Sequence, residues 1–478
     1  MPRLRRVVRV LTVGAAFLAA GLPAAGCTSA SPGPAHATSP AGSPVAELTL
    51  PPGAASPAPT LPGDWLTYHH DSARSGDVPG VPAPGALRQE WRAQLDGAVY
   101  GQPLIVRGTA IAATEHDSVY GLDPATGRVR WHTSLGTPAA RSTLPCGDID
   151  PLGITSTPVY EPGTGLVFTL AELSTGQHVL TGLDPATGEV RVRREAEPPR
   201  GDLHVQQQRG ALAAVAGRVL ITYGGLEGDC ANYVGAVVSV PATGSGPLLT
   251  YAIPTSRQGG IWAPGGPVLA PDGRVLVSVG NGASENGPWD GSDSVLALSP
   301  DSLSVTGSFA PASWPDDNAH DLDLGSLTPA LVGPWVMTVG KRGTGYTLGL
   351  ATRLHHTGVG GEQAQAHLCS AYGTAAVTGA TVFVPCADGL LRVDVGADGV
   401  PRPGWRVPLR ASGSPALGGG AVWVPDYGAG TLLALDQTSG RVLAQVATDT
   451  LPHFVSPVLS GDRVLIGTGT GVTAFGGA

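Results

Sequence analysis

A short sequence unit recurs along this chain. Residues 119–131 read VYGLDPATGRVRW, and residues 180–192 read LTGLDPATGEVRV. Looser copies are VVSVPATGSG, VLALSPDSLSV, YTLGLATRL, LLRVDVGADGV and LLALDQTSGRVLAQ, and the chain ends on a partial copy, GVTAFGGA. Recurrence of one unit at a regular spacing is typical of architectures in which each copy buries its apolar face against the next.

Each unit reads as two antiparallel strands joined by a tight turn. The side chain of Asp123 can cap the turn, Pro124 presets φ, and Gly127 is expected in the left-handed conformation. The second strand then carries alternating residues such as Trp131. Gly 70 and Pro 44 with only 14% charged residues fit a chain with many turns and few amphipathic helices.

Two further strand-like segments precede each hairpin, for example residues 103–114 and 210–224. Four strands per repeat make one blade of a β-propeller. The count of turn-bearing strands predicts an all-β fold, a single β-propeller of about eight four-stranded blades over residues 63–478. We expect the last partial copy to pair with an N-terminal strand near Trp65 or Trp91 and to close the ring. Tandem β-sandwiches are the alternative fold.

Residues 1–27 read as an export signal peptide. Arginines precede an apolar run that is too short for a good membrane-spanning helix. The run ends at Ala-Ala-Gly-Cys, which resembles a bacterial lipobox and predicts lipidation of Cys27; an ordinary cleaved signal with an incidental cysteine is the alternative. Residues 28–62 are small, Pro-rich and almost uncharged, which predicts a disordered tether. We therefore expect a cell-membrane lipoprotein that faces the extracytoplasmic side.

The four remaining cysteines are an even number in an oxidising compartment, so disulfides are expected. Cys369 and Cys386 flank two strand-like segments and are predicted to pair, which leaves Cys146 with Cys230. The formal net charge of −9 comes without any run of Lys or Arg, which argues against nucleic acid as a partner. We expect a monomer.

The repeated turns resemble those of the PQQ-like (pyrroloquinoline-quinone) β-propeller repeat family, and the resemblance covers about residues 63–478. That family includes quinoprotein alcohol dehydrogenases and the lipoprotein subunit of the outer-membrane protein assembly machinery. The resemblance therefore implies the fold more specifically than the activity, because one scaffold hosts both catalysts and binders.

The middle of the chain is similar to part of the quinoprotein dehydrogenase site. Five residues match that site in chain order. Glu227 matches a carboxylate in a Gly-rich segment, Trp262 the tryptophan that forms the floor of the cofactor site, and Asn281 an asparagine in a GNG-like stretch. Asp323, with Asp321 as a competitor, matches an aspartate in a D-x-D-like stretch, and Lys341 matches a later lysine.

The resemblance implies a role for each of these residues. Oxygens of Glu227, Asn281 and Asp323 would bind Ca²⁺, a hard ion. Trp262 would stack on the PQQ cofactor, with Asn281 beside it. Asp323 would act as general base, and Lys341 would stabilise negative charge developing on the quinone oxygen.

The chain also departs from that pattern. It has no pair of adjacent cysteines to form a disulfide over the cofactor and no haem-attachment motif. Structural alternatives stay open for each residue: Glu227 as a turn carboxylate, Asn281 as a left-handed turn residue, and Asp321 or Asp323 as caps of backbone amides. Trp262, like Trp131, Trp405 and Trp423, can instead fill space between blades.

Three functions follow from these observations. The first is a binding or interaction scaffold at the cell envelope, which presents the propeller face to a protein or small-molecule ligand. The second is a PQQ- and Ca²⁺-dependent dehydrogenase that oxidises an alcohol or sugar. The third is a subunit of an envelope protein-assembly complex. The metal hypothesis requires that oxygens of Glu227, Asn281 and Asp323 converge on one point near the propeller axis.

Overall fold

The repeated Asp-Pro-Ala-Thr-Gly turn forms as predicted. In the computed structural model, which describes residues 45–51 and 60–477, β4 (Ser118–Leu122) and β5 (Val129–Ser134) are antiparallel neighbours. Asp123 Oδ1 accepts hydrogen bonds from the backbone N–H groups two and three residues further on, both at 3.0 Å. Gly127 has a φ of 69°. The turn therefore follows from local side-chain chemistry alone.

Antiparallel sheets follow one another along the chain, and each forms one blade; blade 3 has five strands and the other blades have four. Blade 1 consists of β2 (Leu104–Val106), β3 (Thr109–Thr114), β4 and β5. Blade 2 consists of β6 (Val159–Glu161), β7 (Leu166–Glu172), β8 (His178–Leu183) and β9 (Val190–Glu195). Blade 3 consists of β10 (Gln206–Gln207), β11 (Ala213–Val215), β12 (Arg218–Gly225), β13 (Ala236–Pro241) and β14 (Leu249–Ala252). Blade 4 consists of β15 (Val268–Leu269), β16 (Val275–Val279), β17 (Ser294–Leu298) and β18 (Val305–Phe309).

The second half of the chain continues the series. Blade 5 consists of β20 (Ala330–Val332), β21 (Trp335–Val339), β22 (Thr344–Gly349) and β23 (Ala364–His367). Blade 6 consists of β25 (Ala376–Thr378), β26 (Thr381–Cys386), β27 (Gly389–Val395) and β28 (Pro401–Pro408). Blade 7 consists of β29 (Ala416–Gly418), β30 (Ala421–Asp426), β31 (Thr431–Asp436) and β32 (Val442–Ala447). The short elements are η1 (Arg141–Thr143), η2 (Leu203–Val205), α1 (Trp314–His320), η3 (Leu324–Ser326), η4 (Arg353–His355) and the parallel pair β19 (Leu327–Thr328) and β24 (Gly373–Thr374).

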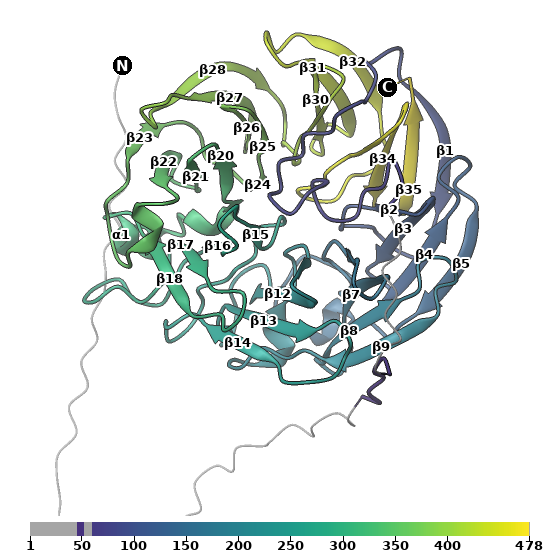
Figure 1. Ribbon diagram of the computed structural model, residues 1–478, viewed down its shortest axis with the longest axis horizontal. Coiled ribbons are helices and arrows are strands. Elements are labelled where there is room, and N and C mark those ends of the chain that lie inside the picture. Colours follow the sequence, from purple (N-terminus) through teal and green to yellow (C-terminus); the bar gives the residue numbers. More distant parts are fainter. Residues whose placement is uncertain (1–44, 52–59, 478) are drawn as a thin grey trace, which may run out of the picture. The chain divides into compact units, whose positions relative to one another are not determined.

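Blade 8 closes the ring. It combines β33 (Val458–Ser460), β34 (Arg463–Thr468) and β35 (Gly471–Gly476) with β1 (Arg88–Gln94), which pairs antiparallel with β35. Figure 1 shows the N-terminal strand beside the last strands of the chain and the eight blades around one axis. Of the two closing positions expected, Trp91 lies in β1, whereas Trp65 bridges to Ile105 in blade 1. The prediction of a closed eight-bladed propeller is confirmed.

Burial differs between the strands of a blade. Every residue of β3 and β4 is buried, whereas β5 at the outer edge has no fully buried residue. The middle strands are covered on both faces by neighbouring blades, which explains their nearly continuous apolar sequence.

Tryptophans connect successive blades. Trp131 of β5 donates a hydrogen bond from its indole Nε1 to the carbonyl of Pro185, in the repeat turn of blade 2, at 3.2 Å. Trp91 makes the equivalent bond to Pro124 at 3.1 Å, and Trp405 bonds the turn of blade 7 in the same way. These indoles therefore have the structural role between blades that the sequence offered as an alternative.

Residues 45–51 pair with the outer edge of blade 2, although the sequence predicts them as part of the tether. Leu48 exchanges two backbone hydrogen bonds with Arg193 in β9, at 2.9 and 2.8 Å. Leu50 is buried in the apolar cluster between blades 2 and 3. One apolar side chain and two ladder bonds thus order a segment whose composition alone predicts disorder. The predicted signal with Cys27, and residues 28–44 and 52–59 of the predicted tether, lie outside the described residues.

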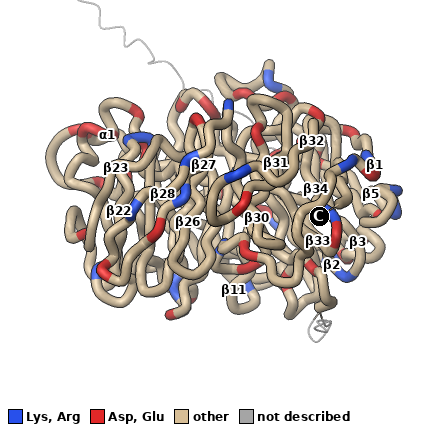
Figure 2. Tube along the Cα trace, turned by 90° about the horizontal axis from the view of Figure 1, so that it is seen from above, with Lys and Arg blue, Asp and Glu red and all other residues tan. Residues whose placement is uncertain are grey.

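Both predicted disulfides are present. Cys146 bonds Cys230 with a Cα–Cα distance of 6.0 Å, and Cys369 bonds Cys386 with a Cα–Cα distance of 5.7 Å. In a view turned by 90°, acidic and basic residues alternate over the blades (Figure 2). Among the described residues, no helix has the length and apolar character needed to cross a membrane.

Candidate functional site

Three of the predicted site residues occupy one equivalent position in successive blades. Glu227, Asn281 and Lys341 each stand two residues beyond the end of the second strand, in blades 3, 4 and 5 respectively. Because every blade repeats the same path around the axis, these positions lie on the same face of the ring. The chain order of the predicted site is therefore a consequence of the repeat.

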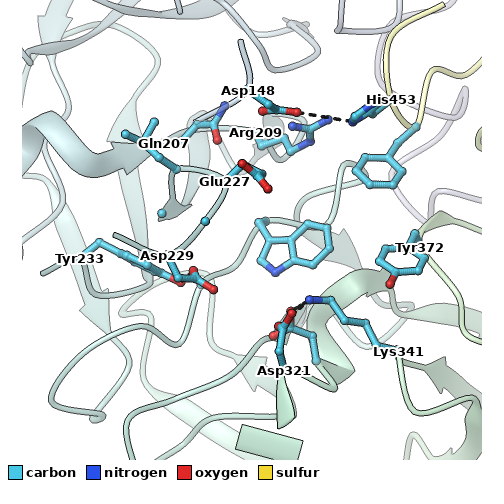
Figure 3. Close-up of a pocket in the computed structure, with 17 residues that line it drawn as sticks. Asp148, Gln207, Arg209, Glu227, Asp229, Tyr233, Asp321, Lys341, Tyr372 and His453 are labelled. Carbon is cyan, nitrogen blue, oxygen red and sulfur yellow. Dashed lines mark hydrogen bonds and ion pairs between the residues drawn. The ribbon is translucent and has the colours of Figure 1, made fainter. Parts of the chain in front are cut away.

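A cavity of about 490 Å³ opens on this face (Figure 3). Its other walls come from the connections between blades. The lining residues are Asp148, Gln207, Arg209, Gly225, Leu226, Glu227, Gly228, Asp229, Tyr233, Gly260, Trp262, Asp321, Asp323, Lys341, Tyr372, His453 and Phe454. The cavity thus contains the predicted Glu227, Trp262, Asp323 and Lys341, and also Asp321.

An ion-paired cluster forms one wall of the cavity. Lys341 Nζ lies 2.6 Å from Asp321 Oδ1 and 2.7 Å from Asp323 Oδ2. It also lies 5.8 Å from the ring centroid of Trp262. The two aspartates that compete in the sequence therefore share a single lysine, and the indole lies next to this group.

Asn281 supports this cluster from behind. Its backbone N–H donates to Asp323 Oδ1 at 2.5 Å, and its side-chain Nδ2 donates to Asp321 Oδ1 at 2.7 Å. Asn281 is buried and does not line the cavity. A Cβ on Gly280 would overlap the carboxylate of Asp323, so a glycine is needed at that position. Asp323 thus caps a backbone amide, as the structural alternative predicted, and also bonds Lys341.

The electrostatics of the pair follow from its burial. Burial raises the pKa of Asp323, while the charge of Lys341 and the hydrogen bonds from Lys341 and Asn281 oppose that shift. For Lys341, burial lowers the pKa, but the charges and hydrogen bonds of Asp323 and Asp321 raise it above its usual value. Lys341 therefore remains protonated across the physiological pH range.

Sequence reasoning missed the opposite wall. The guanidinium of Arg209 lies 4.9 Å from the ring centroid of Phe454, and Tyr372 stacks on the same ring at 6.0 Å. His453 lies 3.5 Å from Asp148. These residues belong to connections between blades whose sequences do not repeat. Phe454 has a φ of 62°, an unusual conformation for a bulky residue, and the sequence carries no signal for it.

Comparison with known proteins finds partial matches to one family model and to two curated proteins. Residues 83–282 match the family model described as outer membrane protein assembly factor BamB. The dehydrogenase subunit of the quinone alcohol dehydrogenase of Gluconobacter oxydans (strain 621H) is 28% identical over 266 residues, which cover 48% of this chain and 33% of that protein. The corresponding subunit of Gluconacetobacter polyoxogenes is 28% identical over 184 residues, 37% of this chain and 24% of that protein. These matches support a relationship to the PQQ-like β-propeller family.

Solved structures show the same fold. A quinohemoprotein alcohol dehydrogenase of Pseudomonas putida HK5 has a TM-score of 0.69 at 16% identity and covers 87% of this chain and 80% of that chain. BamB of Moraxella catarrhalis has a TM-score of 0.55 at 16% identity and covers 82% of this chain and 97% of that chain. The curated relatives are matched over a third or less of their length, so their activity does not carry over with the fold.

Two of the residues expected to bind Ca²⁺ in this propeller, Asp323 and Asn281, are held by other contacts. Both carboxylate oxygens of Asp323 are engaged, one by the amide of Asn281 and one by Lys341. The carboxamide oxygen of Asn281 is buried without a hydrogen-bond partner, in a side chain that does not line the cavity. Over residues 45–51 and 60–477, no group of three or more His, Cys, Asp or Glu side chains is arranged to hold a metal ion. A Ca²⁺ ion at these residues would have to displace Lys341 from the carboxylate of Asp323.

The space above Trp262 is also restricted. The ring centroid of Phe454 lies 6.2 Å from that of Trp262, with the planes inclined by 41°. A planar cofactor between two rings needs about 3.5 Å on each side, or ~7 Å in total. A quinone could enter between these two rings only after displacement of Phe454. The cavity therefore brings Trp262, Asp323 and Lys341 together. Lys341 and Phe454 would both have to move before Ca²⁺ and PQQ could occupy it.

Proposed function

We propose that this protein is an exported binding scaffold, held on the outer side of the cell membrane by a lipid on Cys27, whose axial cavity binds a small organic ligand. The observation that carries the proposal is the cavity itself. Its volume of about 490 Å³ lies in the range of small-molecule sites, about 300–1,000 Å³. Aromatic and charged side chains from connections of several blades meet in it.

The walls are also braced as a binding site requires. The disulfide Cys146–Cys230 lies beside the loop that carries Glu227, and Cys369–Cys386 lies beside Tyr372. A site whose walls are fixed before binding loses less conformational entropy when a ligand enters. This supports a preformed pocket for a ligand that the protein holds without converting it.

A ligand screen by thermal unfolding of the full-length protein tests the proposal. A ligand at 100 times its Kd should stabilise the folded state by about 2.7 kcal/mol. Trp262→Ala should abolish the shift. Trp289→Ala is the matched control, because Trp289 is another partly buried indole that does not line the cavity. A shift that survives in Trp262→Ala would place the ligand elsewhere and contradict the proposal.

A PQQ- and Ca²⁺-dependent dehydrogenase remains the second candidate, favoured by the meeting of Trp262, Asp323 and Lys341 at one cavity. It requires that PQQ with Ca²⁺ raise the unfolding temperature and that the protein then reduce an artificial electron acceptor in the presence of an alcohol or sugar. Dye reduction that disappears in Asp323→Asn would replace the binding scaffold by this enzyme. We expect neither effect.

A further inference from the structure

The charges that line the axial cavity do not cancel. Five carboxylates and two cationic side chains face it, a formal excess of three negative charges. His453 adds no positive charge at neutral pH, because burial and the nearby charge of Arg209 lower its pKa. Low-dielectric walls concentrate the field of such an excess within a cavity. The lining is therefore electrostatically suited to a cation.

Part of that excess lies on one exposed side chain. Asp321 and Asp323 share Lys341, and Asp229 accepts a hydrogen bond from the hydroxyl of Tyr233 at 2.5 Å. Within the described part of the chain, the Glu227 carboxylate has neither an ion pair nor a hydrogen bond. Figure 3 shows its side chain pointing into the open space between these groups. Glu227 is thus available to a ligand.

The aromatic side chains of the cavity already contact cations. Lys341 Nζ lies 5.8 Å from the ring centroid of Trp262, and the guanidinium of Arg209 lies 4.9 Å from that of Phe454. Such distances are those of cation–π contacts, which grow stronger in sites shielded from water. Tyr372, stacked on Phe454, adds a third ring to the lining. The cavity therefore combines ring faces with excess carboxylate.

We infer that the cavity binds an organic cation, a ligand with an ammonium or quaternary ammonium group, between the aromatic rings and the carboxylate of Glu227. This inference rests on the proposed function, because it names the ligand class of the same cavity. A bare metal ion is not favoured, because the carboxylates do not converge on one point. An anion would meet Arg209 but also the excess of negative charge.

Three probes of nearly equal shape separate charge from size. Choline carries a quaternary nitrogen, 3,3-dimethylbutan-1-ol has carbon in place of that nitrogen, and 3,3-dimethylbutanoate carries a negative charge. Calorimetric titration of the full-length protein should give an affinity for choline at least about tenfold above that for the alcohol. The carboxylate probe should bind more weakly than either.

Two carboxylate variants locate the effect. Glu227→Gln should lower the affinity for choline about three- to tenfold and leave that for the alcohol unchanged. Asp301→Asn, which removes an equal charge from an exposed turn outside the cavity, should change neither. Because Glu227 is exposed, its replacement by the isosteric glutamine should not disturb folding.

The outcomes separate this inference from the proposed function. Equal affinity for choline and the alcohol, or tightest binding of the carboxylate, would overturn the cation inference and leave a small-molecule cavity in place. If none of the three probes binds while another ligand from the screen binds at Trp262, the cation inference is likewise overturned and the small-molecule cavity is kept. Failure of every ligand at the cavity would overturn the proposed function as well.

Discussion

At the scale of single residues, glycine decides how closely two blades approach. Gly188 closes the repeat turn of blade 2 with a φ of 73°, and a Cβ there would overlap the indole of Trp131 from blade 1. The carbonyl of Gly188 also accepts a hydrogen bond from Thr133 at 2.7 Å. The contact thus depends on the absence of a side chain as well as on left-handed backbone geometry.

Gly188→Ala should therefore lower the free energy of unfolding by about 2–4 kcal/mol, from backbone strain and overpacking together. Gly108→Ala is the control, because Gly108 has a φ of 74° and open space around it, so only the backbone cost of about 1–2 kcal/mol applies. Urea unfolding of both variants measures the difference. Equal losses would show that the indole moves away at no cost.

Three buried carboxyl groups make stability depend on pH. Burial raises the pKa of Glu115 to about 8, of Asp117 to about 9 and of Glu172 to about 7, and nearby carboxylates add to each shift, with Glu197 the one beside Glu172. Neither carboxylate oxygen of Asp117 has a hydrogen-bond partner in the described structure. In the unfolded chain such groups titrate near pH 4. The folded protein therefore binds more protons than the unfolded chain between about pH 4 and pH 9.

Because stability falls with rising pH wherever the folded state binds more protons, this part of the stability should be fully present below about pH 4 and lost towards pH 9. Asp117→Asn removes one such group and keeps its shape. The variant should be more stable than the parent by at least about 1 kcal/mol at pH 9, with the difference vanishing near pH 4. Asp301→Asn, in an exposed turn, should give no such trend. A difference that is constant with pH would contradict the assignment.

At the scale of elements, the connections on the cavity face are held by the two disulfides rather than by strands. In the loop that precedes Cys230, the backbone N–H of Leu226 donates to Val205 in another connection, and that of Asp229 donates to Leu226 within the same loop. On the other wall, Ala371 bridges to Cys386 next to Tyr372. Each disulfide therefore secures one wall of the cavity.

Replacing Cys146 and Cys230 together by serine should speed amide hydrogen exchange of residues 226–230 at least about tenfold, because local opening becomes easier. Exchange of residues 370–374 should stay unchanged. The reciprocal double variant of Cys369 and Cys386 should show the opposite pattern, so each serves as the control for the other. Uniform acceleration in both would mean that the disulfides stabilise the whole propeller rather than its walls.

The contrast between repeated strands and unrepeated connections explains how much of the fold and the site was predictable from the sequence. Turns such as 123–127 were predictable because their chemistry lies within five residues. The position of Glu227 and Lys341 on one face followed from the repeat. Arg209 and Phe454 were not predictable, because long connections take their path from tertiary packing.

Asn281 shows how prediction from sequence fails at a single position. Its residue type and place in the chain match those of a ligand, yet two hydrogen bonds to Asp321 and Asp323 hold it behind the wall. Those bonds depend on the left-handed turn at Asp321, with a φ of 54°, at the end of α1. The helix α1, which is not part of the repeat, therefore determines the orientation of Asn281, which is part of the repeat.

At the scale of the whole molecule, stability depends on closure of the ring. β35 lies between β34 and β1 in blade 8, and Trp91 of β1 also contacts the turn of blade 1. The N-terminal strand thus joins the last blade to the first. Without β35, both β34 and β1 would expose unpaired backbone groups along their edges.

A chain that ends at Gly469 lacks β35 but keeps every other strand. We expect it to form oligomers or aggregates through the exposed edges, or to unfold at a much lower temperature, because the first and last blades separate and their apolar faces meet water. A chain that lacks only Ala478 should behave as the parent. Light scattering coupled to size exclusion measures the mass of each. A monomeric truncated chain with the parent's unfolding temperature would show that inter-blade packing alone maintains the ring.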